Sequence, residues 1–125
     1  MSLALLISVL LIIATGVAHS YLGERYILMR LFRRGDLPPL FGGPEFTRMT
    51  LRFAWHITTV AWFGLAAILL LIAYDQASIV NLLWVLAATS FASALVAALG
   101  SRLRHLSWLV FLLIAALLSW SALQL

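Results

Sequence analysis

The sequence of 125 residues has no cysteine and no lysine, and only four of its residues are acidic. The absence of cysteine excludes disulfides, thiolate metal sites, iron–sulfur clusters and thiol nucleophiles. The sequence also lacks an H-E-x-x-H helix, a G-x-S-x-G turn, a glycine-rich phosphate loop and the paired E-x-x-H motifs of di-iron bundles. We therefore expect that the protein is not an enzyme.

Long apolar runs are what the sequence has instead. Apolar residues make up 65% of the chain, and its mean hydropathy is +1.12. No charged side chain occurs in residues 3–22, 53–74, 77–99 and 106–123. Each run is close to the ~20 residues that a helix needs to cross ~30 Å of hydrocarbon. The pattern predicts an all-α, four-helix transmembrane bundle with antiparallel up-down topology, in which one domain, 1–125, has helices at about 3–32, 44–74, 77–99 and 105–123.

The eight arginines fall in two stretches, residues 25–52 and 102–104. By the positive-inside rule both stretches lie in the cytoplasm, so both termini face away from it. Because these arginines flank apolar runs, the net charge of +4 does not indicate a nucleic-acid partner. Biased codon usage would replace lysine by arginine, but arginine also binds anionic lipid heads well. The residues expected to contact them are Arg25, Arg30, Arg33, Arg34, Arg48, Arg102 and Arg104.

The connection at residues 33–43 is rich in glycine and proline, which forbid a continuous helix. Pro44 is suited to the first turn of the next helix. Leu37, Leu40 and Phe41 make this loop unusually apolar. The loop is therefore expected either to lie on the membrane surface or to contact a partner.

Small residues recur four apart in the third expected helix, 77–99. At that spacing they let helix backbones approach closely in lipid. This face is expected at the centre of the bundle or at an oligomer contact. Its members are Ala88, Ala92, Ser93, Ala94, Ala97 and Ala98.

Polar side chains gather in the same leaflet as the arginines. His19 and His56 each lie a few residues inside a flanking arginine, so antiparallel helices place both imidazoles at similar depth. His19 and Glu24 are about 140° apart around a regular helix at ~100° per residue. They would face one ion together only if the helix were broken, and Gly23 is a residue at which a break can occur. The polar cluster predicted from helical spacing is Ser20, Glu24, Arg52, His56 and Thr59.

Three interpretations of this cluster remain open. The simplest is an ion pair between Glu24 and Arg52, with the rest of the cluster completing its hydrogen bonds. The second is haem b, with His19 and His56 as axial ligands and Arg52 at the propionates. A metal ion held by the same histidines and His105 is a variant of it. The third is a proton or ion path, although the outer half of the last two helices has no carboxylate or histidine to extend it.

The motif H-S-x-x-G-E at residues 19–24, followed by R-x-x-W-H at residues 52–56, resembles a pattern in small four-helix bacterial inner-membrane proteins. The pattern covers the first two expected helices. The resemblance implies a location in the bacterial inner (plasma) membrane, where termini that face away from the cytoplasm are periplasmic. It also implies that His19, Glu24, Arg52 and His56 act as a group. It implies no activity.

Taken together, these features favour a small integral membrane protein that acts by association. It would be an accessory subunit of a membrane complex or a homo-oligomer, because little mass lies outside the membrane and no catalytic set is complete. A haem-binding, metal-binding or proton-handling protein is the alternative. Transport of a small molecule is the third interpretation. It ranks below the others because small four-helix exporters need an acidic residue in the middle of the first helix, whereas residues 13–16 here are uncharged.

Overall fold

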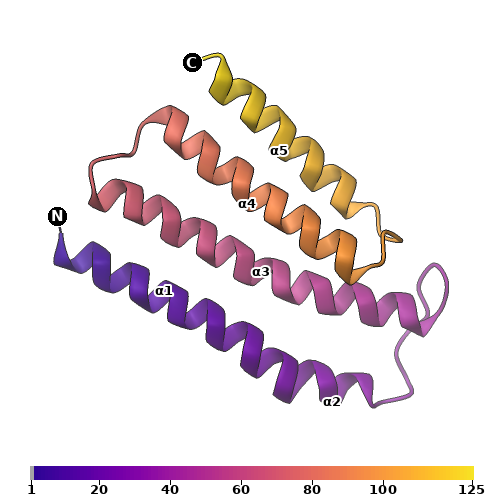
Figure 1. Ribbon diagram of the computed structural model, residues 1–125. Coiled ribbons are helices and arrows are strands. Elements are labelled where there is room, and N and C mark those ends of the chain that lie inside the picture. The colour runs from indigo at the N-terminus through magenta and orange to yellow at the C-terminus, as the bar shows by residue number, and fades with distance from the viewer. Residues whose placement is uncertain (1) are drawn as a thin grey trace.

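The computed structural model describes residues 2–125, and every regular element among them is a helix (Figure 1). The first long helix has three parts, with a π-helical segment in the middle. Leu40 and Gly43 form an isolated β-bridge, the one bridge among the described residues. The elements are α1 (Leu3–Leu22), η1 (Gly23–Leu28), α2 (Met29–Phe32), α3 (Pro44–Ala73), α4 (Ile79–Gly100) and α5 (Ser107–Leu123).

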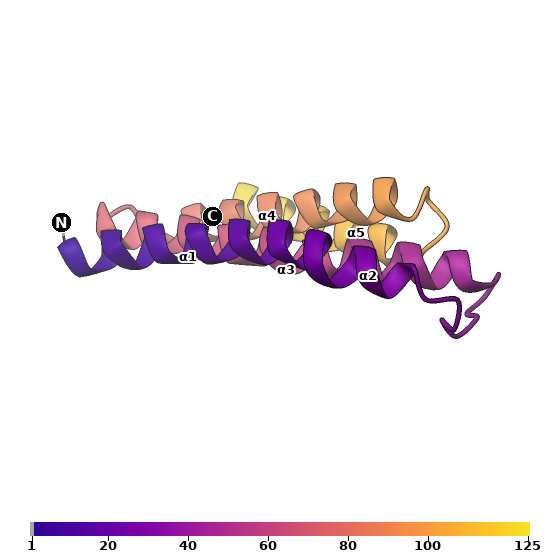
Figure 2. The ribbon, with the colours of Figure 1, turned by 90° about the horizontal axis from the view of Figure 1, so that it is seen from below.

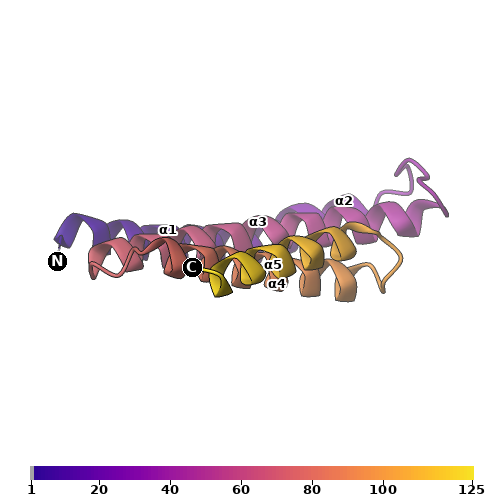
Figure 3. The ribbon, with the colours of Figure 1, turned by 90° about the horizontal axis from the view of Figure 1, so that it is seen from above.

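The all-α prediction with four helices is confirmed, and the long helices lie side by side in an open row. α1 packs against α3, α3 against α4, and α4 against α5, with neighbours running in opposite directions (Figure 1). Figures 2 and 3, which look along the plane of the row from its two sides, show one thin layer with α1 and α5 at opposite edges. Such a layer leaves both apolar faces open. Lipid chains tolerate that arrangement because they are as apolar as leucine and do not drive the faces together.

Three helices are long and apolar enough to cross a membrane: Leu3–Leu31, Pro44–Ala73 and Ile79–Gly100. The fourth, Ser107–Leu123, is apolar but has only 17 residues. The loop at residues 33–43 and the turn at residues 101–106 lie at one end of the row, which we call the arginine end because all eight arginines lie toward it.

Local sequence explains where the long helices begin. Pro44 opens α3, with Glu45 in its first turn near the positive end of the helix dipole. Ser78 caps α4 by accepting a hydrogen bond from the backbone N–H of Asn81 at 3.1 Å. At the other end of α4, the turn that leads to α5 places Arg102 in the left-handed region, with φ of 51°.

Small residues decide how closely α3 and α4 approach. A Cβ at Gly64 of α3 would overlap the side chain of Thr89 on α4. Among the expected packing residues, Ser93, Ala94 and Ala97 are buried, whereas Ala92 and Ala98 are half-buried and Ala88 is exposed. Its neighbour Ala87 is buried instead. Four-residue spacing identifies a face of a helix but does not say which neighbour covers it, and within this chain the face centred on Ala87 is the covered one.

Candidate functional site

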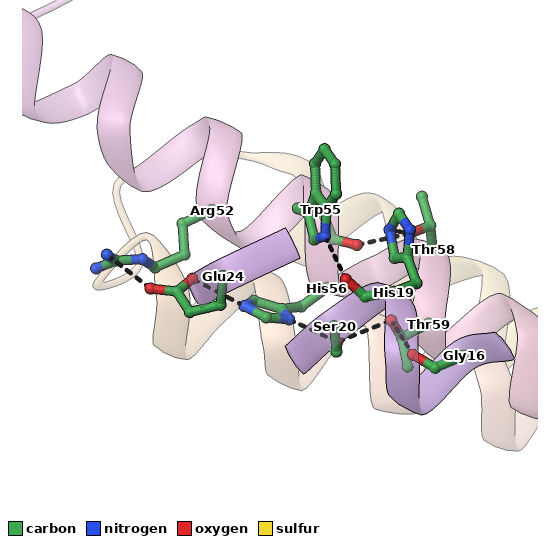
Figure 4. A network of polar contacts seen from close by, with 9 residues as sticks. All are labelled: Gly16, His19, Ser20, Glu24, Arg52, Trp55, His56, Thr58 and Thr59. Carbon is green, nitrogen blue, oxygen red and sulfur yellow. Dashed lines mark hydrogen bonds and ion pairs between the residues drawn. The ribbon is translucent and has the colours of Figure 1, made fainter. Parts of the chain in front are cut away.

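A chain of five polar side chains connects the first long helix to α3 (Figure 4). Glu24 Oε1 lies 2.9 Å from Arg52 Nη2, and Glu24 Oε2 lies 3.4 Å from His56 Nε2. The other ring nitrogen of His56, Nδ1, lies 2.8 Å from Ser20 Oγ. Ser20 Oγ lies 2.8 Å from Thr59 Oγ1, which reaches the backbone oxygen of Gly16 at 3.3 Å. We call Arg52, Glu24, His56, Ser20 and Thr59 the polar chain.

Helical spacing positions the members of the polar chain. Arg52, His56 and Thr59 form one stripe along α3, because residues three and four apart share a helix face. Ser20 and Glu24 are also four apart. Glu24 lies in η1, just beyond the end of α1. The two stripes face each other where α1 and η1 pack on α3.

Trp55 holds the same two helices together from one side. Its indole Nε1–H donates a hydrogen bond to the backbone oxygen of His19 at 3.0 Å. Its ring stacks on the His19 imidazole with centroids 4.5 Å apart and planes 3° from parallel. The indole also lies against Gly23, where any side chain would overlap it. Gly23 is the first residue of η1, and π-helical turns of this kind often mark functional sites.

His19 is therefore held apart from the polar chain. The His19 ring stacks on Trp55, and its Nε2 lies 2.7 Å from Thr58 Oγ1. The Thr58 hydroxyl in turn donates a hydrogen bond to the backbone oxygen of Trp55 at 2.6 Å. Both contacts are satisfied when His19 Nε2–H donates to Thr58 and Thr58 donates to the backbone oxygen. In that arrangement the proton of the His19 ring is on Nε2.

The polar chain can hold either charge state of His56. With a neutral ring protonated at Nε2, His56 donates to Glu24 and Ser20 donates to Nδ1. With both ring nitrogens protonated, Nδ1 donates to Ser20, which can then donate to Thr59, and Thr59 to the backbone oxygen of Gly16. Each state has an acceptor for every proton along this path, so a proton can be taken up without rearranging the helices.

A hydroxyl, an imidazole and a carboxylate in this order are also the parts of a Ser-His-acid triad. Acyl transfer further needs backbone N–H groups that are free to stabilise an oxyanion. Ser20 lies inside α1, where neighbouring backbone N–H groups are used by helical hydrogen bonds. The geometry therefore suits proton holding and helix pairing better than nucleophilic catalysis.

The structure does not bring the three histidines together. His105 stacks on Phe46, meets Phe53 edge-on, and has its Nδ1 2.9 Å from Ser107 Oγ. Within residues 2–125, no group of three histidine or acidic side chains is placed to hold a metal ion. The expected three-histidine metal site is therefore not assembled, because the turn before α5 directs His105 toward the start of α3.

Haem ligation by His19 and His56 would compete with contacts that already exist. Three of their four ring nitrogens lie within hydrogen-bond distance of other side chains. An iron bound at either nitrogen of His56 would displace Ser20 or Glu24. The arrangement is thus a poor fit for axial ligation at His56, whereas Nδ1 of His19 has no such contact among the described residues.

Helical spacing alone did not identify four members of the site. They are Trp55, Thr58 and the glycines at positions 16 and 23. Trp55 directly precedes His56 within R-x-x-W-H, and Gly23 directly precedes Glu24 within H-S-x-x-G-E. A tryptophan facing a glycine across two helices is a signal of close packing, but it becomes visible only when the pairing of the helices is known.

The other expected contact residues lie at the arginine end. Arg25, Arg30, Arg33 and Arg34 are exposed, and Arg48 forms a weak pair with Glu45 at 3.7 Å. Arg102 and Arg104 lie in the exposed turn before α5, and Phe41 in the apolar loop is 95% exposed. Comparisons with protein-family models, with curated proteins and with solved structures found no match.

Proposed function

We propose that the protein is a small integral membrane protein that works by association with other membrane subunits or with copies of itself. In this proposal all four helices cross the bacterial inner membrane, including the shorter α5. The arginine end faces the cytoplasm and both termini face the periplasm. The lengths of the helices and the gathering of all eight arginines toward one end support this placement.

The observation that carries the proposal is the open row. At one edge of the row α5 packs against α4, and a groove of about 350 Å³ runs between these two helices. The groove is lined by larger side chains such as Trp84 and Phe91 and by small residues from both helices, namely Ala87, Ala88, Ala115, Ala116 and Ser119. Small residues let a further helix approach closely in lipid, where packing drives association.

Filling the groove tests this function. The double variant Ala88→Leu/Ala116→Leu adds bulk at two exposed positions of the groove, so the fold itself should persist. We expect native mass spectrometry and cross-linking in membranes to show an assembly for the wild type and its loss in the variant. Ala61→Leu, at an exposed position on α3, is the matched control. A wild type that is monomeric in lipid and co-purifies with no subunit in fixed ratio would refute the proposal.

A second candidate function, proton handling, is supported by the polar chain alone. The chain runs from Arg52 to the backbone of Gly16 and accommodates both charge states of His56. If this function is correct, His56→Ala should lower proton uptake by liposomes that contain the protein, measured with a pH-sensitive dye, while Thr58→Val should not. A Soret band in purified protein that His19→Ala and His56→Ala each abolish would instead favour haem.

A further inference from the structure

A charged cleft of about 450 Å³ opens at the arginine end of the row. It lies where α2, the beginning of α3 and the end of α4 come together. Arg48 and Arg52 enter it from α3, and Arg102 enters it from the turn after α4. Three guanidinium groups from two distant parts of the sequence thus share one cavity with a single carboxylate, that of Glu45.

The positive charge of this cleft is only partly neutralised. Arg52 has a close partner, Glu24, at 2.9 Å. Arg48 meets Glu45 at only 3.7 Å, and both of these side chains are substantially exposed. Arg102 makes no ion pair within the part of the chain that the structure describes. The cleft therefore attracts an anion, and Arg102 is the residue with most charge left to offer it.

The hydrogen bonding of Arg48 is incomplete among the described residues. Its Nε is buried, yet it has no hydrogen-bond partner among the described residues. Buried donors are nearly always paired, because leaving one unpaired costs free energy. Because Nε has almost no accessible surface, an anion in the cleft would meet the exposed part of the Arg48 side chain and would pair with Nε only after that side chain shifts.

The surroundings of the cleft indicate what kind of anion it suits. Phe32 and Leu99 form apolar parts of its wall. Leu99 is 79% exposed and lies at the end of α4, where the apolar span gives way to the arginine-bearing turn. A ligand in this cleft would thus have its charge among the arginines and could extend along apolar side chains.

We propose that the cleft formed by Arg48, Arg52 and Arg102 binds the phosphate group of an anionic phospholipid. Guanidinium groups form paired hydrogen bonds with phosphate oxygens, and arginines near a membrane surface attract anionic lipids. Inorganic phosphate offers the same chemistry without acyl chains, so the experiment needs one arm for each source. This inference does not depend on whether the protein associates with partners.

Arg102→Gln is the informative variant, because Arg102 has no intramolecular ion pair to lose. Arg34→Gln is its matched control: it removes one charge from an exposed residue at the same end of the row, outside the cleft. Full-length wild type and both variants are placed in nanodiscs of phosphatidylcholine with one fifth phosphatidylglycerol. Native mass spectrometry then counts the phosphatidylglycerol molecules that each protein retains. In the second arm, inorganic phosphate is titrated into the protein in neutral detergent, with thermal unfolding as the readout.

We expect the wild type and Arg34→Gln to retain phosphatidylglycerol and Arg102→Gln to retain it at least about fivefold less, the factor expected for one arginine at a membrane surface. Stabilisation by inorganic phosphate that Arg102→Gln abolishes, without lipid retention, would confirm a phosphate site but overturn the lipid as its source. Equal responses of wild type and Arg102→Gln in both arms would overturn the site itself. Circular dichroism of each variant verifies that its helices are intact.

Discussion

The indole of Trp55 occupies the space that a side chain at position 23 would need. Gly23 thus permits three contacts at once: the indole rests on the glycine, donates to the backbone oxygen of His19 and stacks on the His19 ring. The π-helical segment begins at the same residue. This contact fixes the register of α1 against α3, and with it the alignment of the polar chain.

Gly23→Ala should therefore be destabilising. The new methyl group would push the indole away and weaken both its hydrogen bond and its stacking, at a cost of about 1–3 kcal/mol for overpacking. Unfolding in mixed micelles, followed by circular dichroism, measures the change. Gly35→Ala is the control, because nothing lies within 4 Å of a Cβ at that position. Equal stability of the two variants would show that Trp55 does not depend on the glycine.

Removing the charge of Glu24 should weaken the same helix pair. The carboxylate serves Arg52 with one oxygen and His56 with the other. Because the Glu24 side chain is 30% exposed and that of Arg52 is 51% exposed, solvent screens the pair, and we expect Glu24→Gln to cost about 1 kcal/mol. Glu45→Gln, whose partner Arg48 is 3.7 Å away, should change the free energy of unfolding by less than about 0.5 kcal/mol. A larger effect at position 45 than at position 24 would contradict this assignment.

The hydroxyl contact between Ser20 and Thr59 should appear as an energetic coupling. A double-mutant cycle with Ser20→Ala and Thr59→Val is expected to give about 0.6 kcal/mol, with an upper range near 1.7, as for other hydrogen bonds between membrane helices. Ser8 provides the control cycle, since its hydroxyl donates to the backbone of its own helix at Ala4. Pairing Ser8→Ala with Thr59→Val should give no coupling. A zero value for the Ser20 cycle would mean that the contact contributes nothing to helix pairing.

The membrane topology can be tested directly because the natural sequence has no cysteine. Single cysteines are introduced at Gly35, Leu103, Gln76 and Gln124 and labelled in intact cells with a membrane-impermeant maleimide. We expect labelling at positions 76 and 124 from the periplasm and protection at positions 35 and 103, because arginine-bearing segments stay in the cytoplasm. Labelling at position 103 together with position 124 would place both ends of α5 on the same side and show that α5 does not cross the membrane.

The sequence by itself determined what depends on local pattern. Four uncharged runs of nearly membrane-spanning length specify helices, and the arginine stretches mark one end of them. Pro44 marks the beginning of α3. Helical periodicity places Arg52, His56 and Thr59 on one stripe and Ser20 with Glu24 on another. These properties follow from spacing along one helix and need no knowledge of its neighbours.

The tertiary structure alone decided which surfaces meet. In an apolar solvent a helix is apolar all round, so its sequence does not tell which face is covered. The open row, the burial of Ala87 rather than Ala88, and the packing of Trp55 on Gly23 all depend on steric fit between distant segments. Steric fit also brings Arg102 into one cleft with the arginines of α3. No local sequence pattern indicates that these residues lie together.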